Sequence, residues 1–248
     1  MMQNRWVRFG VGFAILGVIL AAIIFGIFLL VTDDSGVSTT PVSAPTLEAE
    51  NNTDETRTLF RIVPDESNVR FIINEELFGT PTEVVGETNQ VAGDLLVDFQ
   101  TPANTELGAI RIDLARMATP NEMRNRALRR FILEATSAEF QYAEFVTTAL
   151  SGLPDTVTVG ETFSFQITGN LSVHGATNEV TFEATVTPVS ETRLEGSATT
   201  QVLYPDYNMT IPNAPGVANV TEEVGLEINF VAIASSDAEA TAEATPAG

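Results

Sequence analysis

Hydrophobic and polar residues alternate along most of the chain after residue 57. Between Phe163 and Val173, apolar and polar residues alternate over eleven positions, which is the period of a β-strand with one buried face. Residues 180–187 repeat the pattern, and the HGATN segment between the two runs is turn-like. We therefore expect the two runs to pair as a hairpin.

Further segments have the same strand character, which gives eight to ten strands in total. They are TLFRIV, NVRFIIN, VAGDLLVDFQ, GAIRIDL, FQYAEFVTTAL, EGSATTQVL and VGLEINFVA. Most of these segments carry one apolar face. The pattern predicts an all-β protein built as an antiparallel sandwich or barrel.

One segment, TPNEMRNRALRRFILEATS, has apolar residues near helical spacing. Thr119 is a suitable cap and Pro120 a suitable first residue, so we expect one short helix from about Pro120 to Glu134. Four arginines lie within seven positions of this helix. They are Arg124, Arg126, Arg129 and Arg130.

The N-terminal region has a different composition from the rest of the chain. Residues 9–31 carry no charge, and about 20 apolar helical residues cross a bilayer core. Arg5 and Arg8 precede the run, and Asp33 and Asp34 follow it. These flanks predict a single transmembrane helix that contacts the membrane through residues 7–31, with a cytoplasmic N-terminus and an extracytoplasmic domain.

A cleaved signal peptide is the alternative interpretation of residues 1–31, but the apolar run is longer than a signal peptide needs and FLLVTDDSG offers no good cleavage site. We therefore expect an uncleaved anchor over 1–31. Residues 32–56 and 235–248 are rich in Thr, Ala, Ser and acidic residues, which predicts a disordered linker and a disordered acidic tail. The domain between them spans 57–234.

Composition limits the chemistry that the chain can perform. It has no cysteine, and all 12 basic residues are arginine against 33 acidic residues, for a net charge of -21. These counts exclude disulfides, thiolate metal sites and lysine chemistry, and they argue against nucleic acid as a partner. His174 is the one histidine, and a lone histidine makes a poor catalytic triad and a poor metal site, so we expect neither an enzyme nor a cofactor.

Several segments together, in this order, resemble the YceI-like family of lipid- and polyisoprenoid-binding proteins. The most specific is GNLSVHGATNEVTF, which is similar to the family's G-x-L-x-(I/V)-x-G-x-T-x-x-V hairpin. The others are FRIVPDESNVRFII, VVGETNQVAGDLLVDF, MRNRALRRFILEATSAEFQYAEF, YPDYNM and EEVGLEINF. The resemblance covers about residues 59–232. It implies a lipocalin-like antiparallel barrel of eight strands that holds a long isoprenoid or fatty chain in an apolar channel.

The apolar strand faces are the candidate binding site. An eight-stranded barrel can either enclose one small ligand or be filled by its own side chains, so a ligand channel and a filled core remain alternatives. The candidate channel residues are Phe71, Ile73, Leu95, Val97, Phe99, Phe163, Phe165, Ile167, Leu171, Phe182 and Phe230.

Arginine and histidine side chains are candidates for contact with a polar head group. Arg124, Arg126 and Arg130 could pair with phosphate or carboxylate, since guanidinium binds both groups in a bidentate manner. The alternative is an ordinary solvated helix face. His174 could lie near a head group or could be only a turn residue.

Two interpretations of function follow. The first is a membrane-anchored, extracytoplasmic module that binds a polyisoprenoid or another lipid inside the barrel. The second is a non-catalytic structural or protein-interaction ectodomain with a filled core. The oligomeric state stays open.

Overall fold

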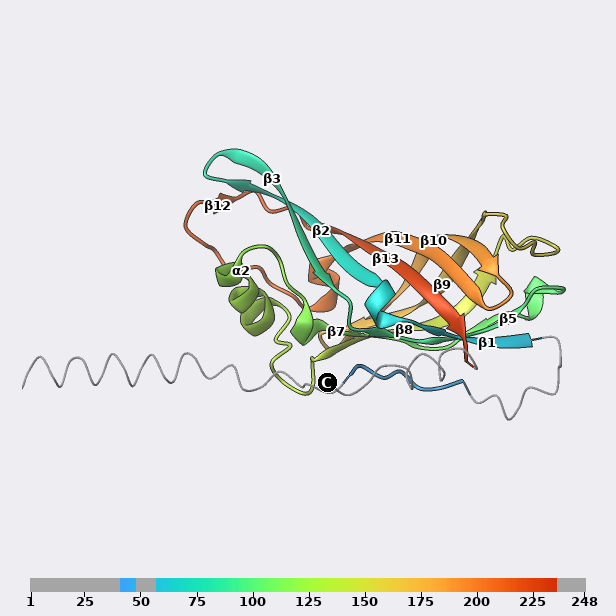
Figure 1. The fold of residues 1–248 in the computed structure, drawn as a ribbon. Helices are drawn as coiled ribbons and strands as arrows, with labels where there is room; N and C mark the ends of the chain where they lie inside the picture. The colour runs from blue at the N-terminus through green and yellow to red at the C-terminus, as the bar shows by residue number, and fades with distance from the viewer. Residues whose placement is uncertain (1–40, 48–56, 236–248) are drawn as a thin grey trace, which may run out of the picture. The chain divides into compact units, whose positions relative to one another are not determined.

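The alternating segments form one curled antiparallel sheet, a half-barrel, with a short helical segment at one end (Figure 1). The computed structural model describes residues 41–47 and 57–235. The strands of this part of the chain are β1 (Arg57–Ile62), β2 (Asn68–Leu77), β3 (Thr80–Thr88), β4 (Val91–Ala92), β5 (Asp94–Asp98), β6 (Glu106–Leu107), β7 (Ile110–Asp113), β8 (Tyr142–Ser151), β9 (Phe163–Val173), β10 (Ala176–Ser190), β11 (Arg193–Leu203), β12 (Val217–Ala218) and β13 (Glu223–Ala234). The all-β class and the antiparallel pairing are confirmed.

The order of the strands explains the curl of the sheet. Neighbours follow the order β4-β7-β8-β9-β10-β11-β13-β1-β5-β6, and β2 also pairs with β13. Strands β1 and β2 run one after the other along β13. The three strands that follow β2 each pair with a different strand: β3 with β2, β4 with β7 and β5 with β1. These divided pairings bend the sheet around an interior.

The expected count of eight strands differs from the thirteen strands of the described residues. The difference arises from short breaks within long stretches of extended chain. A 3₁₀ turn, η2 (Pro64–Glu66), separates β1 from β2, while Asn89–Gln90 and Gly93 separate β3, β4 and β5. Each break lets one stretch change its pairing partner.

Polar contacts hold the break at η2 against the sheet. The backbone amide of Val63 donates to the carbonyl of Val231 at 2.8 Å, and the Val231 amide donates to Ser67 Oγ at 3.1 Å. Arg193 Nη2 lies 2.7 Å from Glu66 Oε2 and donates to it. This hydrogen bond holds the pKa of the Glu66 carboxyl below its usual value of 4.5.

The hairpin predicted from the alternating runs is confirmed. Strand β9 pairs with β10 from Val173 opposite Ala176 to Phe163 opposite Val186. The turn is shorter than the HGATN segment, because only His174 and Gly175 lie outside the strands. Their φ angles of +49° and +74° place both in the left-handed region, as a two-residue hairpin turn of type I′ requires.

The predicted helix is present but shorter than expected. It comprises α2 (Glu122–Ala127) and a π-helical turn, η5 (Leu128–Ile132), so the expected start at Pro120 and end at Glu134 were wrong. The cap is Asn121, whose Oδ1 accepts from the amides of Met123 at 3.0 Å and Arg124 at 3.1 Å. An asparagine cap closer to the apolar run thus replaces Thr119.

Thr119 has a different role. Its amide and its Oγ1 donate to Asn125 Oδ1 at 2.7 and 2.8 Å, and Asn125 Nδ2 donates back to the Thr119 carbonyl at 3.0 Å. Asn125 is only 1% exposed. These three bonds tie α2 to the chain that precedes it and so fix where Met123 and Arg124 stand at the end of the sheet.

The predicted membrane anchor, 1–31, lies outside the described residues, as does the predicted tail except Ser235. Within residues 41–47 and 57–235, no helix has the length and apolar character that a membrane crossing requires. Part of the predicted linker, 41–47, lies against the sheet. Val42 is 8% exposed, the Leu47 amide donates to Asp94 Oδ2 at 3.2 Å, and Arg111 donates to the Ser43 carbonyl at 3.2 Å.

Candidate functional site

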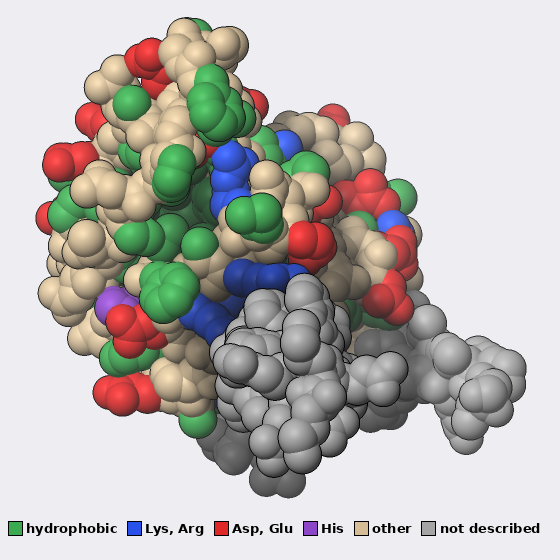
Figure 2. Space-filling view, turned by 90° about the vertical axis from the view of Figure 1, so that its left-hand side faces the viewer, with side chains coloured by type: hydrophobic (Ala, Val, Ile, Leu, Met, Phe, Trp, Pro, Cys, Tyr) green, Lys and Arg blue, Asp and Glu red, His purple; other side chains and the backbone are tan. Residues whose placement is uncertain are grey.

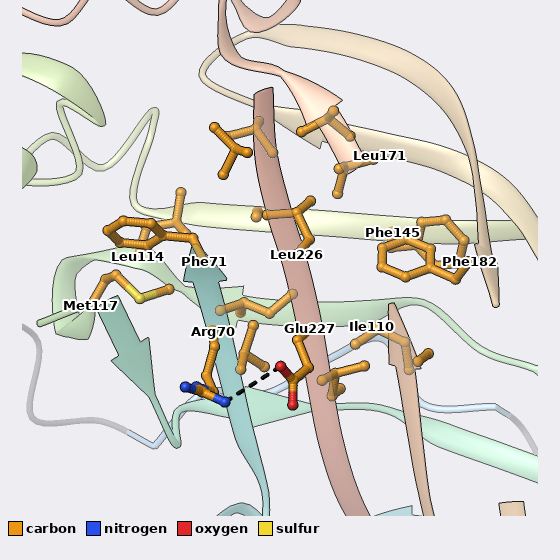
Figure 3. A pocket seen from close by; sticks show the side chains of 18 of the residues that line it. Arg70, Phe71, Ile110, Leu114, Met117, Phe145, Leu171, Phe182, Leu226 and Glu227 are labelled. Carbon is orange, nitrogen blue, oxygen red and sulfur yellow. Dashed lines mark hydrogen bonds and ion pairs between the residues drawn. The ribbon is translucent and has the colours of Figure 1, made fainter. Parts of the chain in front are cut away.

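The inside of the curled sheet holds a cavity of about 920 Å³ (Figure 3). This volume is near the upper end of the range for sites that bind small molecules. Its lining residues come from most of the long strands and from α2, η5 and the chain that leads to β12. Nearly all of them are apolar. The polar and charged ones are Arg70, Glu75, Thr105, Asn121, Arg124, Tyr204, Tyr207 and Glu227.

All eleven residues predicted to face a channel line this cavity: Phe71, Ile73, Leu95, Val97, Phe99, Phe163, Phe165, Ile167, Leu171, Phe182 and Phe230. They come from β2, β5, β9, β10 and β13 and from the chain just after β5. Strand alternation directs every second side chain to one face, and the antiparallel register brings the apolar faces of these strands together.

The sequence prediction missed several residues of the cavity wall. Figure 3 shows four of them, Ile110, Leu114, Met117 and Leu226. Ile110 and Leu226 have the same alternation as the residues that were found, so the pattern could have identified them. Leu114 begins the 3₁₀ turn η4 (Leu114–Arg116), and Met117 follows that turn, where no periodic signal exists.

Small side chains on neighbouring strands leave room in the cavity. Ala184 on β10 lies between Phe165 on β9 and Ala198 on β11 in the sheet, and both alanines line the cavity. Aromatic rings pack at the wall beside them, since the Phe145 and Phe182 rings meet edge to face at 5.2 Å. The Phe71 ring lies over Gly86, where any Cβ atom would collide with it.

The cavity reaches solvent at the end of the sheet that carries α2. Phe78 and Met123 both line the cavity, and each is 81% exposed, so the opening must lie beside them. Figure 2 views this end and shows a hollow surrounded by hydrophobic side chains, with arginine side chains next to it. We call this opening the mouth.

The charged groups of the cavity wall occur as pairs. Arg124 Nη2 at the mouth lies 2.6 Å from Glu75 Oε1, and the Glu75 side chain is only 9% exposed. Arg70 Nη1 lies 3.4 Å from Glu227 Oε2 across β2 and β13 (Figure 3). Each cation therefore has an anion beside it, and the four charges of the wall sum to zero.

The structure separates the four predicted head-group residues. Arg124 lines the cavity, whereas Arg126 and Arg130 are exposed side chains of α2 and η5 that do not line it. His174 also lies outside the lining. Its ring packs on Phe140 at 4.5 Å, and its Nδ1 lies 3.3 Å from the Tyr207 carbonyl.

Tyr207 adds one buried hydroxyl to the wall. The residue is 2% exposed, and its Oη has no hydrogen-bond partner among the described residues. Burial raises the pKa of this phenol above its usual value of 10, so it stays neutral. No group of three or more acidic or histidine side chains in the described ranges could hold a metal ion. The arrangement is suited to enclosing an apolar molecule.

Comparisons with known proteins agree with this geometry. The model of the YceI-like domain family matches residues 60–232. The fold is similar to that of a polyisoprenoid binding domain from Saccharophagus degradans implicated in plant cell wall breakdown, with a TM-score of 0.56 and 17% identity over 71% of this chain and 98% of that one. It is also similar to BcnA from Burkholderia cenocepacia, with a TM-score of 0.53 and 19% identity over 68% of this chain and 98% of that one.

No curated protein matches the chain. The two structural likenesses show a shared fold, a curled antiparallel sheet with one short helix. The family model covers more than half of the 248 residues and includes every residue that lines the cavity. The chain therefore belongs to the YceI-like domain family.

Proposed function

We propose that this protein is a non-catalytic module that binds a long, uncharged apolar chain, such as a polyisoprenoid, in the cavity of the curled sheet. The observation that carries the proposal is the cavity of about 920 Å³ with an almost wholly apolar wall. The name of the similar Saccharophagus degradans domain, a polyisoprenoid binding domain, supports the same class of ligand.

The cavity favours a ligand channel over a filled core. Protein interiors are packed about as densely as organic crystals, and voids larger than a few water molecules are rare in them. Burying each methylene group of a ligand against such a wall contributes about 0.8 kcal/mol. A long chain therefore gains affinity from length alone, without any directional contact.

The paired charges favour a ligand whose part inside the cavity is uncharged. An ion moved into an apolar cavity without a partner is strongly destabilised. Glu75 and Glu227 already lie against the two cations of the wall, Arg124 and Arg70, so no cation is left over for an anionic group. A charged head group would have to lie at the mouth or outside it.

Extraction of the purified full chain with organic solvent, followed by mass spectrometry, tests the proposal. We expect one class of long-chain isoprenoid or other neutral lipid at close to one molecule per protein. The Ala184→Phe variant, purified in parallel, is the control. Lipids extracted in equal amounts from both proteins are bound outside the cavity. Identical extracts from the two proteins would contradict binding in the cavity.

The apolar run at residues 9–31 supports a further part of the proposal, namely that the domain is anchored in the cell membrane and faces the extracytoplasmic side. Protease added to intact cells is then expected to release the domain by cutting within residues 32–56. A mature N-terminus beyond residue 31 would contradict the anchor, and a protected domain would contradict the orientation.

A further inference from the structure

Three apolar side chains at the end of the sheet that carries the mouth are far more exposed than other large apolar side chains of the described residues. Phe78 and Met123 are 81% exposed and Phe131 is 65% exposed, whereas the next most exposed, Val189, reaches 46%. Phe78 belongs to the β2–β3 turn, Met123 to α2 and Phe131 to η5. We call these three residues the rim. Apolar side chains gathered at one place on a surface mark an interaction site.

Phe78 occupies a backbone conformation that is unfavourable for a bulky residue. Phe78 and Gly79 form the two-residue turn between β2 and β3, with φ angles of +49° and +80°. This conformation suits Asn or Gly at the first position and is unfavourable for a bulky residue. The Phe78 amide donates to the Gly216 carbonyl at 2.6 Å, and its ring covers Gly216, so the neighbouring loop holds it in place. Strain of this kind is concentrated at functional sites.

The helical segment that carries Met123 and Phe131 has a charge opposite to that of the whole chain. Between residues 122 and 132 there are four arginines and one glutamate, in a chain with a net charge of -21. Arg126 and Arg130 are exposed and form no ion pair within the described part of the chain. They lie on the same helical segment as Met123 and Phe131. Figure 2 shows arginine side chains gathered next to the apolar hollow.

We propose that the rim and the adjacent arginines form a docking surface for an anionic lipid bilayer, so that the cavity exchanges its ligand directly with the membrane. This inference adds a route of loading to the proposed function. Aromatic and aliphatic side chains enter the boundary between head groups and acyl chains, while arginines beside them attract anionic head groups. An otherwise acidic surface is repelled from such a membrane, so the domain is expected to dock with the mouth toward it.

A bilayer fits these observations better than a protein partner does. The rim side chains project from the β2–β3 turn and from one helical segment, and Phe78 and Met123 lie at the opening itself, so a flat partner would cover the mouth and close it. A long apolar chain also has very low solubility in water, because each exposed methylene group is unfavourable by about 0.8 kcal/mol. Contact between the mouth and the bilayer lets the ligand move between them without passing through water.

The absence of cysteine allows a clean test in the full chain. An environment-sensitive fluorophore on a Phe131→Cys variant stands in for the aromatic ring at the rim. The control carries the same label on Val189→Cys, which lies near the far end of β10, roughly 40 Å along the strand from the β9–β10 turn. Both proteins are reconstituted in vesicles of phosphatidylcholine, with or without phosphatidylglycerol, that contain lipids carrying a quencher on the acyl chain.

We expect quenching of the label at position 131 in vesicles with phosphatidylglycerol and little quenching at position 189. Arg126→Gln combined with Arg130→Gln should lower the ratio of docked to undocked protein by about 25-fold, since each arginine near an anionic surface contributes about a fivefold preference. In the absence of phosphatidylglycerol this pair of substitutions should have little effect.

Phe78→Asn separates docking from folding, because asparagine suits the turn better than phenylalanine does. This variant should be at least as stable as the wild type, yet its docked-to-undocked ratio should fall about tenfold or more. No quenching at position 131 would overturn the inference and point to a protein partner at the rim. Equal quenching at positions 131 and 189 would also overturn it, because the bilayer would then contact the domain without preference for the rim. The depth of the label does not depend on bound ligand, so this result is independent of the extraction experiment.

Discussion

Replacing Ala184 with phenylalanine should remove most of the bound ligand while the domain remains folded. Ala184 is 2% exposed, lines the cavity and lies between Phe165 and Ala198 in the sheet. In a filled core, such an enlargement would lower the free energy of unfolding by about 1–3 kcal/mol. Beside the cavity, the added ring can extend into the space of the ligand. Losing room for two methylene groups corresponds to about a 15-fold loss of affinity.

The measurement pairs a lipid-loading assay with a thermal melt of the same protein. Val146→Phe is the matched control, because Val146 is 43% exposed and does not line the cavity, and its loading and stability should stay close to those of the wild type. A large loss of stability in Ala184→Phe would indicate a filled core at this position. Unchanged loading in a stable variant would mean that the ligand lies elsewhere.

Gly169→Ala should lower the free energy of unfolding by about 1–3 kcal/mol, the usual cost of overpacking. A Cβ atom on Gly169 would lie 2.5 Å from the carbonyl oxygen of Val146 and 2.6 Å from the ring of Phe145. The carbonyl belongs to β8, beside an irregularity in its pairing with β9 between Thr147 and Ala149. Because the ring lines the cavity, a displaced Phe145 should also change ligand loading.

Gly225→Ala serves as the control for this substitution. Its Cβ atom would meet Ile72 at 3.6 Å, an ordinary van der Waals contact, and alanine is more favourable than glycine within a strand. Urea unfolding of both variants gives the comparison. If Gly169→Ala were as stable as Gly225→Ala, β8 would have to be free to move away from β9, and the wall of the cavity would be less rigid than its packing indicates.

The wall of the cavity could be predicted well wherever it consists of regular strands. The alternation from Phe163 to Val173 identified Phe163, Phe165, Ile167 and Leu171, because the period of two directs them all to one face. The alternation shows which face is buried. It does not show whether a ligand or other side chains cover that face, since both require the same residues.

The mouth could not be predicted in the same way. Phe78 was not identified, because its importance comes from a left-handed turn and an exposed ring, neither of which produces a periodic pattern. The sequence pattern pointed to Thr119 as the cap of the helix, whereas Asn121 is the cap in the structure. The choice depended on Asn125, which binds Thr119 through a buried contact that sequence spacing does not reveal. The breaks that divide the long strands likewise depend on tertiary pairing.

The pairing of β13 with β1 and β2 has a consequence for how the chain folds. Strands β8 to β11 follow one another as neighbours in the sheet, so they can assemble from nearby segments. Strand β13 must find partners at the other end of the domain, as in the contact between Val231 and Ser67, which are 164 positions apart. Loop-closure entropy makes such a contact slow and late. The cavity is therefore completed only at the end of folding, and a nascent chain that has not yet released β13 lacks one of the walls that enclose it.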